Sequence, residues 1–68
     1  MSYVIIRVRE GLPRDLVPDR QGAPLVFERR RTAQTYVATV LDHSAAEYRV
    51  YKTDRLPEYI ESYMRAMA

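Results

Sequence analysis

Apolar and polar positions alternate clearly near the start of the chain. Val4, Ile6 and Val8 fall on one face of an extended segment, and the residues between them fall on the other. Alternation of this kind in a segment rich in β-branched side chains predicts a strand over residues 3–9 with one core face.

The next segment, residues 10–24, contains both glycines and three of the four prolines. Glycine and proline favour turns and interrupt strands, so this segment is predicted to be a loop, which is long for a compact domain. Residues 25–28 then form a short apolar run, which predicts a second strand.

Residues 32–42 fit two structures. Larger apolar side chains recur at helical spacing on one face, and they are Ala33, Tyr36, Val37, Val40 and Leu41. The β-branched residues Thr35, Val37 and Thr39 also suit a strand. We predict a helix, because strand alternation would divide the apolar side chains between two faces. Thr32 is its expected N-cap.

The last third of the chain predicts one more strand and one more helix. Tyr48 and Val50 alternate with Arg49 and Tyr51, which predicts a third strand over 47–52. An apolar stripe at helical spacing then predicts a helix over 57–67, with Pro57 in its first turn. Leu56 lies four residues before Ile60 and is expected to pack against it as a hydrophobic staple.

These elements predict an α+β fold with a three-stranded sheet and two amphipathic helices in the order ββαβα. A chain of 68 residues has room for one domain, residues 1–68. A domain of this size buries only about 60% of the surface that its unfolded chain exposes. Cysteine is absent, so disulfides cannot contribute, and a homodimer would supply further burial.

The net charge of the chain excludes few classes of binding partner. The chain has 11 basic and 9 acidic residues and a net charge of +2, which is too small by itself to indicate nucleic acid binding. Ten of the cations are arginines, which suit bidentate contacts to carboxylates or phosphates. The longest apolar stretch near the N-terminus is too short for a signal peptide or a membrane span, so we expect a soluble, cytoplasmic protein without a membrane partner.

No catalytic or metal-binding set can be assembled from the sequence. Asp42, His43 and Ser44 are the residue types of a hydrolytic triad, but adjacent side chains cannot align in such a relay. One histidine without carboxylates at ligand spacing does not indicate a metal, and two isolated glycines build no nucleotide-binding loop. We expect no catalytic residues, no metal and no cofactor.

Arg29, Arg30 and Arg31 are the most unusual feature. They lie where the predicted helix begins, at the end of the dipole that disfavours cations. One interpretation is an anion- or partner-binding site, with Arg49 and Tyr51 as further members. The other is a solvated run of charges relieved by Glu28 and Asp42.

The C-terminal helix also has two interpretations. Its stripe contains adaptable side chains of the kind found at protein contacts, and they are Tyr59, Tyr63, Met64 and Met67. The stripe can pack within the chain, or it can form a dimer or partner interface.

Several segments together resemble short accessory proteins encoded by phages and plasmids, anti-CRISPR inhibitors among them. The resemblance rests on a strand–strand–helix–strand pattern carried by Tyr3–Ile6, Pro24–Phe27, Ala33–Tyr36 and Tyr48–Val50. It implies a protein that acts by binding and blocking a host complex rather than by catalysis.

Two functional hypotheses follow. The first is a non-enzymatic interaction protein that binds another macromolecule, most simply a protein, through a Tyr/Arg-rich surface. The alternative is a small nucleic-acid-binding module, in which Arg29, Arg30 and Arg31 contact phosphate together with Arg7, Arg9 and Arg49.

Overall fold

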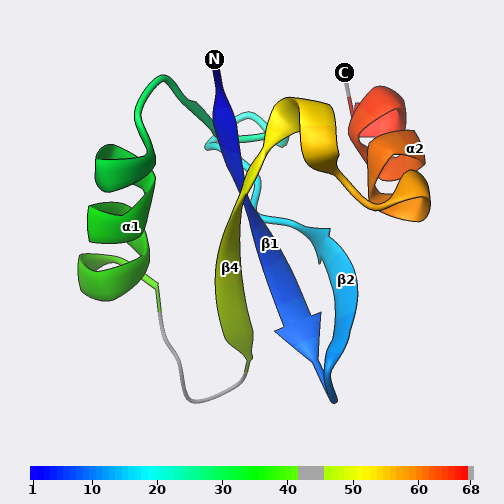
Figure 1. The fold of residues 1–68 in the computed structure, drawn as a ribbon, viewed down its shortest axis with the longest axis horizontal. Coiled ribbons are helices and arrows are strands. Elements are labelled where there is room, and N and C mark those ends of the chain that lie inside the picture. The colour runs from blue at the N-terminus through cyan, green and yellow to red at the C-terminus, as the bar shows by residue number, and fades with distance from the viewer. Residues whose placement is uncertain (42–45, 68) are drawn as a thin grey trace.

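The centre of the fold is strand β1 (Tyr3–Arg9), which belongs to a four-stranded antiparallel sheet (Figure 1). The computed structural model describes residues 1–41 and 46–67, and within the last helix it leaves out the side chains of Tyr59, Tyr63, Met64, Ala66 and Met67. The α+β class is confirmed. The order is β1, β2 (Leu12–Leu16), β3 (Val26–Phe27), α1 (Arg30–Thr39), β4 (Glu47–Lys52), a 3-10 turn (Thr53–Arg55) and α2 (Glu58–Met67).

Strand β2 is the main departure from the predicted three-stranded sheet and ββαβα order. It lies inside the segment expected to be a loop. Glu10 and Gly11 both have positive φ angles, 55° and 76°, and they form a two-residue turn between Arg9 and Leu12, which are register partners. This backbone twist matches the twist of paired strands, so the chain returns along β1 as a hairpin. Pro13 is tolerated because β2 is an edge strand.

Strand β1 pairs with three other strands along its two edges. β4 pairs along one edge, from Tyr3 opposite Lys52 to Val8 opposite Glu47. β2 and β3 share the other edge, with β2 beside the second half of β1 and β3 beside Tyr3 and Val4. The amide of Val17 extends the β2 pairing by donating to the carbonyl of Ile5 at 2.9 Å.

The two helices cover opposite faces of this sheet (Figure 1). On one face, Ile60 of α2 packs with Leu16 of β2 and with the β1 side chains Val4, Ile6 and Val8. On the other face, Ala33 of α1 packs with Ile5 and Val17. The prediction of one core face for β1 was therefore wrong: its centre is buried on both sides.

Helix α1 begins earlier than predicted. The helix itself is confirmed, but it spans Arg30–Thr39 rather than 32–42, and its N-cap is Arg29 rather than Thr32. The Arg29 side chain makes no capping hydrogen bond, so a side-chain cap does not fix the start of the helix. The rings of Phe27 and Tyr36, 5.5 Å apart, join β3 to the second half of α1.

The remaining predicted elements correspond closely to the structure. The strand over 3–9 and the strand over 47–52 are confirmed as β1 and β4, whereas the strand over 25–28 is reduced to Val26–Phe27. The helix over 57–67 is confirmed as α2, one residue shorter at its start. Leu56 packs against the cluster that contains Ile60, as the predicted staple requires.

Candidate functional site

The three consecutive arginines lie in and just before the first turn of α1. Arg29 is the N-cap, Arg30 and Arg31 are the first helical residues, and all three are exposed. The first turn contains no acidic residue. The positive charge of the three guanidinium groups therefore adds to the positive end of the helix dipole, and no carboxylate in the first turn of α1 neutralises it.

Arg30 is held in place by an aromatic ring. Its guanidinium carbon lies 5.6 Å from the centre of the Tyr3 ring, within the range of a cation–π contact. Among residues 1–41 and 46–67, no carboxylate forms an ion pair with Arg30. Its donors therefore remain directed toward solvent, while Tyr3 limits where the side chain can lie.

Arg49 and Tyr51 of β4 occupy a different face from the one that α1 covers. Arg49 lies opposite Ile6, Tyr51 lies opposite Val4, and both β1 partners pack toward α2. Tyr51 is half-buried against that cluster. Arg49 is more exposed and forms an ion pair of 3.3 Å with Glu47. Of these two predicted site residues, Arg49 therefore remains the more accessible.

A groove brings Arg30 and Arg49 together at the edge of β4 that faces away from β1. The groove has a volume of about 280 Å³ and is lined by six side chains: Arg30, Gln34 and Val37 from α1, and Tyr48, Arg49 and Val50 from β4. Tyr48 and Val50 point to the α1 face, whereas Arg49 points to the opposite face. A hollow that is lined by both faces of one strand lies at the edge of that strand. We call it the β4–α1 groove.

The backbone edge beside this groove has no strand partner in the described part of the chain. β4 pairs with β1 along its full length, and no other described strand pairs with it. An edge strand presents a row of backbone donors and acceptors that can pair with another extended chain. Helix α1 forms the opposite wall, so the edge and the helix together bound a slot.

Only part of this groove was foreseeable from the sequence. Arg30 and Arg49 were predicted site residues, whereas Val37 was predicted only on the apolar face of a helix, and Tyr48 and Val50 only on one face of a strand. All three do pack against the cluster beneath α1, and their remaining surface lines the groove. Gln34 was missed, although Arg30, Gln34 and Val37 have the spacing of one helical stripe.

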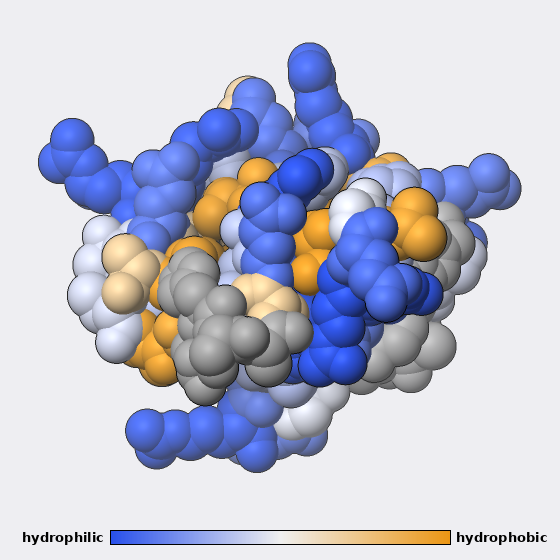
Figure 2. Space-filling model, turned by 90° about the horizontal axis from the view of Figure 1, so that it is seen from below, coloured by the Kyte–Doolittle hydropathy of each residue, from blue (hydrophilic) through white to orange (hydrophobic). Residues whose placement is uncertain are grey.

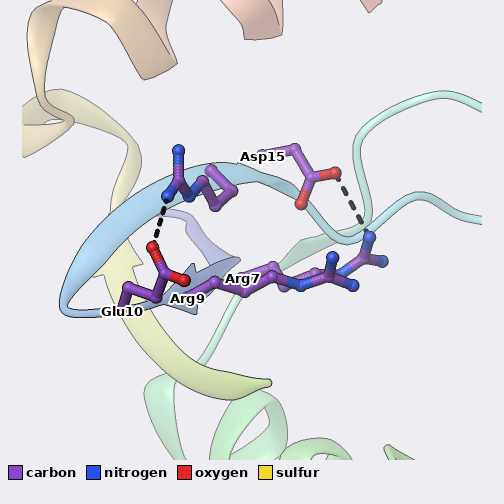
Figure 3. A pocket seen from close by; sticks show the side chains of 5 residues that line it. Arg7, Arg9, Glu10 and Asp15 are labelled. Atoms are coloured by element: carbon purple, nitrogen blue, oxygen red, sulfur yellow. Dashed lines mark hydrogen bonds and ion pairs between the residues drawn. The ribbon is translucent and has the colours of Figure 1, made fainter. Parts of the chain in front are cut away.

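A second cluster of charged residues lies at the β1–β2 hairpin (Figure 3). Arg7 donates to Asp15 at 3.2 Å, and Arg14 pairs with Glu10 at 3.5 Å. Arg9 runs beside Arg7 in Figure 3 and forms no ion pair with a described residue. Because the two carboxylates neutralise two of the three local guanidiniums, this cluster has less charge to offer a ligand than the start of α1.

The two oxygens of the Asp15 carboxylate differ in the hairpin cluster. Oδ1 is buried and accepts no hydrogen bond from a described residue, while Oδ2 accepts from Arg7. The Asp15 side chain as a whole remains 28% exposed, so solvent reaches the carboxylate from one side. The sequence did not reveal this cluster because it forms only when the Glu10–Gly11 turn brings β2 back beside β1.

Hydrophobic surface appears at the end of the molecule that holds this hairpin. Figure 2 views that end and shows hydrophobic patches between hydrophilic side chains that project around them. Leu12, just after the hairpin turn, and Val40, just after α1, are 57% and 59% exposed. The start of α1, with its arginines, lies at the opposite end of the helix (Figure 1).

The predicted interface on α2 is only partly described. The side chains of Tyr59, Tyr63, Met64 and Met67 lie outside the described residues, as do Asp42, His43 and Ser44. The helix backbone and Ile60 are described, and Ile60 is fully buried within the same chain. Intramolecular packing therefore accounts for at least this part of the apolar stripe. No helix in residues 1–41 and 46–67 has both the length and the hydropathy needed to cross a bilayer.

Replacing Arg29, Arg30 and Arg31 together by glutamine is expected to leave the fold intact. Exposed substitutions usually change stability within about 0.5 kcal/mol each. Loss of the Arg30–Tyr3 contact costs about 0.5–1 kcal/mol, and relief of cation repulsion at the helix start offsets part of it. Thermal unfolding followed by circular dichroism should show a Tm within several degrees of the parent. Loss of the folded baseline would show that the arginines are structural.

Comparisons with protein-family models, with curated proteins and with solved structures give no match to this chain.

Proposed function

We propose that this chain is a non-enzymatic interaction protein that binds an extended segment of a partner protein along the edge of β4 that faces away from β1. One observation carries the proposal: the β4–α1 groove combines a strand edge, a helical wall and two arginines in one slot. In strand addition, main-chain hydrogen bonds supply affinity, and pockets for alternate side chains supply specificity.

The dimensions of β4 suit this role. It spans six residues, which is an ordinary strand length, and it contains neither proline nor glycine. It also shows no register shift along β1, whereas the β1–β2 pair is irregular between Arg7 and Val8. Bulges and prolines are devices that keep edge strands from pairing, and β4 has neither.

The chemistry of the lining residues favours binding over catalysis. Arg30, Gln34 and Arg49 supply polar groups, and Val37, Val50 and the Tyr48 ring supply apolar surface. Tyrosine and arginine are enriched at binding surfaces. These six lining residues contain no nucleophile paired with a general base. A partner whose extended segment is held in the groove cannot use that segment for its own contacts. Such blocking is the mode of action that the resemblance to phage- and plasmid-encoded inhibitors implies.

Selection from a displayed library of random hexapeptides, as long as β4 itself, tests the proposal. A synthetic version of an enriched peptide should shift the backbone amide NMR signals of residues 47–52. Methylation of alternate peptide nitrogens should abolish the shifts, because it removes main-chain donors while keeping every side chain.

Two other outcomes would contradict this function. Shifts confined to residues outside β4 and α1 would place binding elsewhere. Preferential binding of a single-stranded oligonucleotide at the α1 start, with a steep loss between low and moderate salt, would favour the nucleic-acid alternative, because phosphate contacts release counterions.

A further inference from the structure

The two ends of the β4–α1 groove differ in charge. At one end, Arg30 lies over Tyr3, and Tyr3 is the register partner of Lys52. Two cations therefore mark this end, which we call the Lys52 end. Arg31 and the uncapped start of α1 lie beside it, and the first turn of the helix holds no carboxylate.

The other end is apolar. Val37 lies two turns further along α1, and it lines the groove together with Tyr48 and Val50, all of them half-buried. We call this the Tyr48 end. The acidic residue nearest to it on β4 is Glu47, which is exposed and already paired with Arg49. Because Glu47 and Arg49 balance each other's charge, the unbalanced positive charge beside the groove lies at the Lys52 end, where a negatively charged ligand group is favoured.

From this gradient we propose that the bound segment carries an acidic side chain at the Lys52 end and an apolar side chain at the Tyr48 end. The inference rests on the proposed strand addition and adds the chemistry of the partner. Arg30 is the principal recognition residue, because Tyr3 positions its guanidinium and no described carboxylate pairs with it. A carboxylate can accept two parallel hydrogen bonds from such a group.

The geometry also gives the spacing of the two side chains. Arg30 and Val37 are seven residues apart on α1, which corresponds to about 10 Å along a helix axis. The Arg30 side chain leans toward the helix N-terminus and lengthens this separation. Side chains on one face of a strand repeat about every 7 Å. The acidic and apolar positions are therefore expected to be four residues apart, both facing α1.

Blocked hexapeptides of defined sequence test this inference. The probe is acetyl-Glu-Thr-Thr-Thr-Val-Thr-amide, used together with the reverse order, acetyl-Thr-Val-Thr-Thr-Thr-Glu-amide, so that both strand directions are sampled. Matched peptides carry glutamine or lysine in place of glutamate. Amide shifts of β4 residues measure the affinity of each peptide for the parent chain.

In at least one direction, the glutamate peptide should bind about tenfold tighter than the glutamine peptide, and the lysine peptide should bind more weakly still. Arg30→Gln should remove the difference between glutamate and glutamine peptides. Arg55→Gln is the matched control, because Arg55 is exposed, forms no ion pair with a described residue and lies outside the groove. This variant should retain the difference.

Each contrary result has a distinct meaning. Equal affinity for glutamate and glutamine peptides would overturn the acidic preference and leave strand addition standing. Absence of β4 shifts with every peptide would overturn strand addition itself. Loss of the difference in Arg55→Gln as well would show a general charge effect rather than recognition by Arg30. Concentration-dependent β4 shifts without peptide would show that a second copy of the chain occupies the edge.

Discussion

Replacement of Ile60 by alanine is expected to lower the free energy of unfolding by about 2–5 kcal/mol. Ile60 is fully buried, and among the described side chains of α2 it is the one that enters the cluster formed by Leu16 and the Val4, Ile6 and Val8 side of β1. Truncation of Ile60 removes apolar contacts to this face of the sheet. Of the two described helices, only α2 covers this face. A domain of this size has little stability to spare, so a loss of this size would leave much of the chain unfolded.

Urea denaturation followed by circular dichroism measures this effect. Ser62→Ala is the matched control, because Ser62 is exposed on the same helix, and it should change the unfolding free energy by less than about 0.5 kcal/mol. An Ile60→Ala variant as stable as the parent would show that α2 does not pack on its own sheet. A loss that disappears at high protein concentration would instead indicate that the helix is buried between two copies.

Replacement of Ala33 by leucine is expected to destabilise the chain by about 1–3 kcal/mol. Ala33 has no exposed surface and packs against Ile5 and Val17, so its methyl group lies where α1 approaches the sheet most closely. A larger side chain would have to push α1 away from β1 or adopt a strained rotamer. Displacement of α1 would also move the wall of the groove that holds Arg30.

Ala38→Leu provides the control for helix propensity and added volume. Ala38 belongs to the same helix but is exposed, so leucine there should change stability by less than about 0.5 kcal/mol. Thermal and urea unfolding of both variants give the comparison. Equal stability of Ala33→Leu and Ala38→Leu would contradict the close contact between α1 and β1.

Local patterns in the sequence were sufficient for most individual elements. Alternation predicted β1 and β4, and helical spacing predicted α1 and α2, because these periodicities belong to single elements and can be read without knowing their neighbours. The arginines at the start of α1 were also identified from their position alone. Their exposure is compatible with both interpretations of the run, a binding site and a solvated run of charges.

Strand β2 shows where local patterns fail. Its sequence contains Pro13 and the two charged residues Arg14 and Asp15, and the turn before it is Glu10–Gly11 rather than a common hairpin pair. Pairing with β1 and burial of Leu16 beneath α2 outweigh the weak strand propensity. Both contributions exist only after the hairpin has closed.

The α+β class, the periodic strands and helices, and the run of arginines could all be predicted from local sequence patterns. The placement of α1 and α2 on opposite faces of β1 could not, because an apolar stripe requires burial but does not specify the face that supplies it. The same holds for the groove. Arg30 and Arg49 meet because the stripe of α1 lies along the edge of β4, and that neighbourhood depends on strand register and helix packing rather than on local sequence.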